Sequence, residues 1–150
     1  MSGFVGGAAL FAINARAAPV NGTIYQEENF TVPPHRVYAV LLDEKEFSTI
    51  TGAPARIGGG EGDAFSLFGG AIVGRNLELV PDRRLVQAWR PSDWGAGLYS
   101  VVRFELTPAV QGTHLVFNQV GYPLNDEASL KSGWHSHYWE PMKKYFLNKK

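Results

Sequence analysis

The chain contains no cysteine, no excess charge of either sign and no apolar run long enough to span a bilayer. The absence of cysteine excludes disulfides and thiolate metal sites. Lysine plus arginine and aspartate plus glutamate both number 14, so the formal net charge is zero. Nucleic-acid-binding domains usually carry a basic stripe, so we expect no nucleic-acid partner. The lack of a long apolar run predicts no membrane span. We expect a cytoplasmic protein.

Recognisable catalytic motifs are also absent. The chain has no G-x-S-x-G and no H-E-x-x-H sequence. His135 and His137 stand two positions apart in a predicted helix, so they face different sides and cannot chelate one metal ion. The glycine run at residues 58–62 precedes a predicted strand, whereas a phosphate cradle needs a helix N-terminus. We therefore expect a non-enzymatic domain without a metal or a cofactor.

The first 22 residues differ from the rest of the chain. Residues 4–13 are small and apolar, and Ala15-Arg16-Ala17 has the A-x-A form of a signal-peptidase site. No lysine or arginine precedes this run, so the basic start of a signal peptide is missing. Residues 1–22 are interpreted as a flexible segment or as the remnant of an export signal, in which case the protein is exported. The folded domain is then residues 23–150.

From there, short segments rich in β-forming residues alternate with turns. The alternation is clearest at residues 98–106, where Val102, Phe104 and Leu106 share one face. Two short helices interrupt the series after the first strand, one beginning at Pro34 and one at residues 44–50. The predicted strands are residues 23–32, 55–57, 63–68, 71–80, 84–90, 98–106 and 113–121.

The last segment has a helical period. Leu130, Trp134, Tyr138, Met142 and Tyr145 recur at intervals of four or three and form one face of a helix over residues 128–147. Such a helix is about 30 Å long. A proline at position 141 lies inside it, and its missing N–H predicts a kink.

Consecutive strands joined by short turns form an antiparallel meander with one face to bury. Only the long aromatic helix is large enough to cover that face. The predicted fold is therefore α+β, a helix-grip fold: a curved antiparallel sheet of about six to seven strands around a long C-terminal helix, with two short helices after the first strand.

Several motifs resemble one known family. The segment GWHSHYWEPMK, residues 133–143, resembles the end of the domain named after the activator of the heat-shock-protein-90 ATPase. GAIVG at residues 70–74, LVP at 79–81 and LVQAWR at 85–90 match further elements of that family in order. Trp94, Gly97 and the turn QGT at residues 111–113 also fit. The resemblance covers residues 25–146.

This resemblance implies a helix-grip domain of the START-like (SRPBCC) superfamily, whose members often hold apolar ligands between sheet and helix. The eukaryotic activator is similar only in its second domain, and nothing here corresponds to its separate N-terminal domain. The resemblance therefore implies the fold more firmly than the chaperone activity. It brings no catalytic residues.

Two functions remain open. The first is binding of a small apolar or amphipathic ligand between the sheet and the C-terminal helix. The alternative is a co-chaperone-like protein-interaction domain, expected to be a monomer, that stimulates a heat-shock-protein-90-type ATPase. A solid core disfavours the ligand, and an exposed apolar patch favours a chaperone partner. The candidate ligand-binding residues are Ile72, Asn76, Ser100, Val102, Phe104, Leu115, Phe117, Gln119, Trp134, Tyr138 and Met142.

Overall fold

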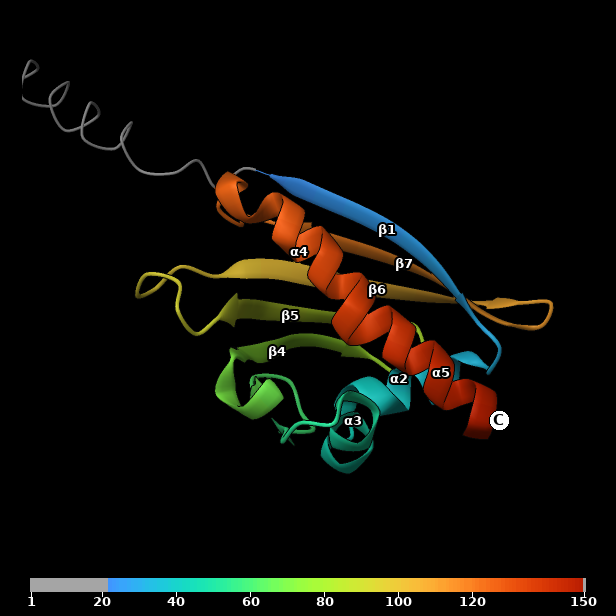
Figure 1. The fold of residues 1–150 in the computed structure, drawn as a ribbon. Helices are drawn as coiled ribbons and strands as arrows, with labels where there is room; N and C mark the ends of the chain where they lie inside the picture. Colours follow the sequence, from blue (N-terminus) through green and yellow to red (C-terminus); the bar gives the residue numbers. More distant parts are fainter. Residues whose placement is uncertain (1–21, 150) are drawn as a thin grey trace, which may run out of the picture.

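The computed structural model describes residues 22–149, so the expectations for the N-terminal segment lie outside the described residues except at Gly22. A seven-stranded antiparallel sheet curves around one long C-terminal helix, as predicted (Figure 1). The sheet strands are β1 (Thr23–Phe30), β2 (Arg56–Ile57), β3 (Ala64–Leu67), β4 (Ile72–Val80), β5 (Arg84–Pro91), β6 (Ser100–Ala109) and β7 (Gly112–Val120).

The strand order is β1-β7-β6-β5-β4-β3-β2, so the first strand pairs with the last. Thr23 lies opposite Val120 and Phe30 opposite Thr113 in this antiparallel pair. Strands β2 to β7 form the predicted meander. The helices α2 (Pro34–Leu42) and α3 (Glu44–Thr51) carry the chain from one edge of the sheet to the other and close one end of it (Figure 1).

These two short helices begin and end where their sequences predict. Pro34 stands in the first turn of α2, where a missing N–H costs nothing. The Asp43 carboxylate accepts a hydrogen bond from the Glu46 backbone N–H at 2.9 Å and so caps α3. Gly52 ends α3 in the left-handed conformation, with φ at 75°.

The C-terminal helix has three parts: α4 (Glu127–Trp134), a π-helical segment (His135–Trp139) and α5 (Glu140–Lys149). The irregularity expected from Pro141 takes the form of the π segment immediately before it. There the Glu140 backbone N–H donates to the carbonyl of His135, five residues earlier. Among the described residues, no helix is long and apolar enough to cross a membrane.

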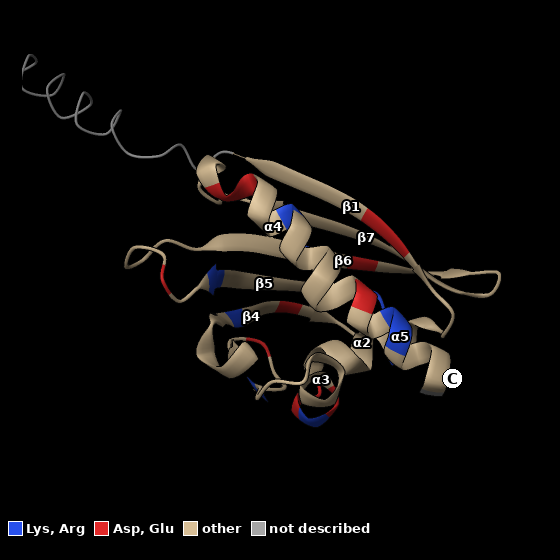
Figure 2. Cartoon of the chain, in the orientation of Figure 1, with Lys and Arg blue, Asp and Glu red and all other residues tan. Residues whose placement is uncertain are grey.

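The core lies between this helix and the concave face of the sheet. Burial alternates along β6 and β7, which places Val102, Phe104, Leu115 and Phe117 inside. The other face of the sheet meets solvent; we call it the outer face. Acidic and basic residues are interspersed along the strands and helices, in keeping with the zero net charge (Figure 2).

Candidate functional site

The space between the C-terminal helix and strands β6 and β7 is filled by aromatic rings, and we call it the closed flank. The Phe117 ring lies 4.2 Å from the Trp134 ring and 5.3 Å from the Phe104 ring, measured between centroids. Trp139 packs edge-on against Phe117 at 5.4 Å. All four side chains are nearly or fully buried. Contacts at these distances are those of a close-packed core.

Buried polar groups in the closed flank form one directed chain of hydrogen bonds. The Trp134 indole N–H donates to Gln119 Oε1 at 2.8 Å. Gln119 Nε2 donates to Ser100 Oγ at 3.0 Å, and Ser100 Oγ donates to the Trp89 carbonyl at 2.7 Å. Each buried group therefore has a protein partner without a ligand.

Asn76 lies in a separate network. Its amide nitrogen donates to the Gly58 carbonyl at 2.8 Å, and its amide oxygen accepts from Gln87 Nε2 at 3.1 Å. Asn76 thus anchors the glycine-rich loop at residues 58–62 to β4 and β5. That loop connects β2 to β3.

The remaining interior candidates are packed as well. A cavity of about 10 Å³ beside Phe104 and Tyr138 has room for roughly one water molecule. Eight of the eleven candidate residues therefore lie in packed surroundings and do not line the cleft described next: Asn76, Ser100, Val102, Phe104, Leu115, Phe117, Gln119 and Met142.

A cleft of about 280 Å³ opens on the other flank of the same helix. It lies between α4, the π segment, the ends of β4 and β5, and the 3-10 turn Phe68–Gly70. Ile72, Trp134 and Tyr138 are the three candidates that line it. The full lining is Phe68, Ala71, Ile72, Trp89, Pro91, Ser129, Leu130, Gly133, Trp134, His137 and Tyr138.

The walls of this cleft are mainly apolar; Ser129 and His137 are among the lining residues, and Trp89 and Tyr138 form a polar pair. Trp89 Nε1 donates to the Tyr138 hydroxyl oxygen at 3.4 Å. Burial raises the pKa of Tyr138 above its usual range, so the phenol keeps its proton at neutral pH. Within residues 22–149, that proton has no acceptor. The Tyr138 hydroxyl is therefore a hydrogen-bond donor that the cleft can offer to a ligand.

The 3-10 turn at the mouth of the cleft has an unusual backbone. Phe68 adopts φ of 54°, a left-handed conformation that is rare for a bulky side chain. Its ring packs edge-on against Tyr138 at 5.8 Å and against His137 at 5.7 Å. Phe68 is not among the residues predicted for the site, because nothing in its neighbourhood except the following glycines indicates a left-handed turn.

The loop that follows Pro91, a residue of the cleft wall, is pinned to the start of the C-terminal helix. Trp94 Nε1 donates to Asp126 Oδ2 at 2.8 Å, which ties residues 92–99 to the start of α4. Asp126 therefore holds a tryptophan and does not cap the helix with its side chain. The Trp94 of the family-like motif has a structural role at this edge.

The outer face carries exposed apolar side chains around a shallow hollow. Val101 and Val120 lie opposite each other on β6 and β7 and are 40% and 43% exposed. The charges beside them are partly paired, because Arg84 contacts Glu78 at 3.0 Å and Glu105 at 3.2 Å. The hollow, about 500 Å³, is lined by Glu78, Arg84, Val86, Val101, Arg103, Asn118 and Val120.

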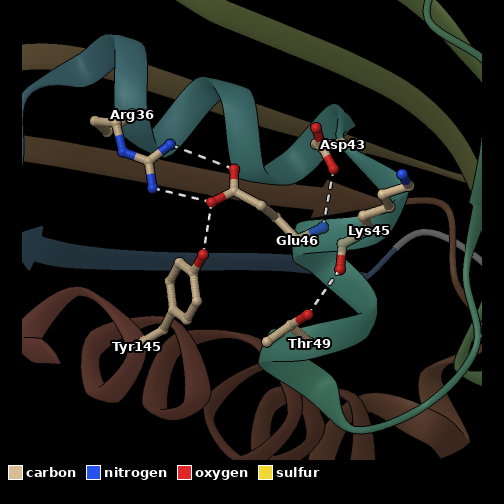
Figure 3. Close-up of polar contacts among 6 residues, drawn as sticks. All are labelled: Arg36, Asp43, Lys45, Glu46, Thr49 and Tyr145. Carbon is tan, nitrogen blue, oxygen red and sulfur yellow. Dashed lines mark hydrogen bonds and ion pairs between the residues drawn. The ribbon is translucent and has the colours of Figure 1, made fainter. Parts of the chain in front are cut away.

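A polar cluster joins three helices at the far end of the fold (Figure 3). Arg36 binds both carboxylate oxygens of Glu46, at 3.0 and 3.3 Å, and the Tyr145 hydroxyl donates to the same carboxylate at 2.6 Å. This hydrogen bond raises the pKa of Tyr145. The cluster holds α2, α3 and α5 together. Across the described residues, no group of three or more acidic or histidine side chains is placed to hold a metal ion.

Sequence comparison relates the chain to known proteins. The human activator of 90 kDa heat shock protein ATPase homolog 1 is 27% identical over 120 residues, which are 80% of this chain and 36% of that protein. An uncharacterized protein of Schizosaccharomyces pombe is 31% identical over 134 residues, 88% of this chain and 40% of its own length. The chain thus spans less than half the length of these relatives.

Structure comparison gives the same fold. The crystal structure of an Hsp90 activator from Plasmodium falciparum superposes with a TM-score of 0.74 at 24% identity, covering 85% of this chain and 96% of that one. The family described as activator of Hsp90 ATPase homolog 1-like protein matches residues 31–147. The chain belongs to this family.

Proposed function

We propose that the chain is a protein-interaction domain that binds an Hsp90-class chaperone and stimulates its ATPase. Family membership over residues 31–147 carries the proposal, together with relatives whose names describe activators of that ATPase. Because the chain covers only 36% of the human relative, the activity is proposed for this one domain by itself.

The outer face is the surface proposed for the contact. Val101 and Val120 are exposed there in the middle of a sheet, next to the exposed guanidinium of Arg103. An interface core that combines apolar side chains with arginine is typical of protein partners. The closed flank supports this choice, because its packed rings are buried and cannot contact a partner protein.

The test is the ATPase rate of a purified Hsp90-class chaperone as the full chain is titrated in. The wild-type protein is expected to raise the rate, and Val101→Glu is expected to lose that effect. Val110→Glu is the matched control, because Val110 is fully exposed at the tip of the β6–β7 hairpin and away from the hollow. An unchanged rate with the wild type contradicts the function, whereas equal stimulation by both variants contradicts only the surface.

A second function is favoured by the cleft: binding of a small apolar or amphipathic ligand. Its volume of about 280 Å³ lies near the lower end of the range of small-molecule sites, about 300–1,000 Å³. Ile72, Trp134 and Tyr138 would contact the ligand, and the buried Ser100 and Gln119 would hold Trp134 in place behind it.

Native mass spectrometry of the protein purified from its own host tests this second function. A retained small molecule, lost on denaturation, is the expected result. The second function is contradicted if the purified protein carries no ligand and if added apolar probes leave the tryptophan emission of Trp89 and Trp134 unchanged.

A further inference from the structure

Three local irregularities of the chain meet at the cleft. Phe68 has a left-handed backbone, Gly133 lies inside a helix, and the π segment His135–Trp139 interrupts the α-helical pattern. Each is unfavourable or rare where it stands. Departures from local preference tend to gather at functional sites, where something other than stability selects them. Pro141 accounts for part of the π segment, but it explains neither of the other two.

Gly133 has no packing reason to be glycine. It stands in α4 without a positive φ, so any residue fits its backbone. A Cβ added there would meet only His137 Cδ2, at 3.8 Å, an ordinary contact. Glycine within a helix is unfavourable relative to alanine. What a larger side chain would fill is the cleft, because Gly133 is part of its wall.

Phe68 faces the same space under strain. Its left-handed φ of 54° is followed by Gly69 and Gly70, with φ of 66° and 99°. This backbone conformation points the Phe68 ring toward Tyr138 and His137 at the mouth of the cleft. A ring on a turn that contains two glycines can be displaced at lower cost than a ring on a strand of the sheet.

We propose that the cleft binds an uncharged, planar aromatic small molecule that lies against the backbone at Gly133, with Phe68 as the adjustable wall that sets the size admitted. This inference rests on the ligand-binding function proposed above. The lining contains no aspartate, glutamate, lysine or arginine, and His137 is its one basic side chain, a composition that suits a neutral ligand. The rings of Trp89 and Trp134 pack on each other at 5.0 Å and border the cleft, so a ligand ring can make edge-to-face contacts with them, and a glycine permits a flat ring to approach the helix backbone. An acceptor atom on the ligand takes the free proton of Tyr138.

Calorimetric titration of the full chain with 2-naphthol tests the role of Gly133. Gly133→Leu fills the cleft from the helix side and is expected to weaken binding by at least about tenfold. Ser132→Leu is the matched control, because the neighbouring side chain is exposed and does not line the cleft. It is expected to leave the affinity unchanged, and thermal unfolding shows that both variants are folded.

The size and shape of the ligand are tested with two further probes. Wild type is expected to bind 2-naphthol more tightly than decahydro-2-naphthol, its saturated counterpart, and more tightly than 1-pyrenemethanol. Phe68→Ala removes the movable wall and is expected to shift the preference toward 1-pyrenemethanol by about tenfold.

The outcomes separate this inference from the function on which it rests. If wild type binds 2-naphthol but Gly133→Leu binds it equally well, or Phe68→Ala leaves the size preference unchanged, ligand binding stands and the inference is wrong. Equal affinity for the planar and saturated probes also overturns it. If wild type binds none of the three probes, while native mass spectrometry detects a retained ligand, the ligand class is wrong and the binding function survives. If no probe binds and no retained ligand is detected, both the ligand-binding function and this inference are contradicted.

Discussion

The two flanks of the C-terminal helix are built from shared aromatic residues, yet one is solid and the other is open. On the closed flank, Trp134 meets Phe117 at 4.2 Å, and behind it lies Phe104. On the other flank, the same indole borders a cleft whose opposite wall includes Ala71. The difference follows from side-chain size: phenylalanines fill the space beside β6 and β7, whereas Ala71 and Gly133 leave it empty.

Polar groups differ between the flanks in the same sense. On the closed flank, hydrogen bonds run from the Trp134 indole through Gln119 and Ser100 to a backbone carbonyl, so each of these three side chains donates to a protein acceptor. In the cleft, the proton of Tyr138 has no acceptor among residues 22–149. The closed flank thus satisfies this hydrogen-bond network internally, while the cleft leaves the Tyr138 donor for a ligand to satisfy.

The largest expected effect would sharpen this contrast through stability. Phe117→Ala on the closed flank should lower the free energy of unfolding by about 3–5 kcal/mol, because the removed ring leaves a buried cavity. Ile72→Ala beside the cleft should cost clearly less, because its side chain is only partly buried and loses fewer contacts. Urea unfolding of both variants measures the difference, and equal losses would show that the cleft is closed in solution.

A smaller effect is expected from the polar chain. Gln119→Leu should cost about 1–3 kcal/mol, because the buried Trp134 N–H loses its acceptor. Asn118→Leu is the control one residue away. Asn118 lies on the outer face and loses only an exposed contact with Arg103 at 3.2 Å. If the two variants are equally stable by urea unfolding, the polar chain contributes nothing and the flanks differ in packing alone.

The alternation of the strands predicted which residues face inward. Alternation predicts that Ser100 lies on the same face of its strand as Val102, and Gln119 on the same face as Phe117. All four side chains are buried. Asn76 was assigned to the same interior, but it holds the loop at residues 58–62 in a separate network, next to an irregularity in the β4–β5 register. Periodicity predicts a face and says little about neighbours along that face, particularly across a bulge.

The cleft itself was beyond the reach of sequence patterns. Its walls come from segments as distant as Phe68 and Leu130, and its volume depends on the sizes of facing side chains. The pairing of β1 with β7 is similarly non-local. Only Ile72, Trp134 and Tyr138 were anticipated on the cleft, because each lies on an inward face that also reaches this edge. The left-handed conformation of Phe68 was not predictable from the sequence, since the local preference of a phenylalanine opposes it.

A third prediction concerns the far end of the helix, beyond the cleft, where polar contacts replace aromatic packing. Tyr145→Phe should cost about 0.5–1.5 kcal/mol through loss of the hydrogen bond to Glu46. Because that bond raises the pKa of Tyr145 above its unfolded value of about 10, the added stability is complete below about pH 10. It is lost as the pH rises through the folded pKa.

This prediction is checked by measuring unfolding between about pH 8 and 11, the range over which tyrosine titrates. The difference in stability between wild type and Tyr145→Phe should shrink toward the alkaline end. Tyr99→Phe is the control, because the Tyr99 side chain is exposed and its hydroxyl forms no hydrogen bond to a carboxylate of the described residues. A constant difference across the range would mean that the Tyr145 hydroxyl does not stabilise the helix end.

The smallest expected effect has the opposite sign and bears directly on why the cleft is open. Gly133→Ala should stabilise the protein by about 0.5–1 kcal/mol, because alanine loses less backbone freedom than glycine on entering a helix. The added Cβ makes only an ordinary contact with His137, so no strain offsets the gain. Thermal unfolding of Gly133→Ala against Ser132→Ala separates the glycine effect from general helix propensity. A loss of stability in Gly133→Ala would show that the glycine is required by packing, and the cleft would then be a by-product of the fold. A gain in stability in Gly133→Ala would mean that the native glycine makes α4 less stable than it could be. Because α4 lies beside Phe68, the one aromatic residue with a left-handed backbone among the described residues, the open flank would then need a reason other than stability.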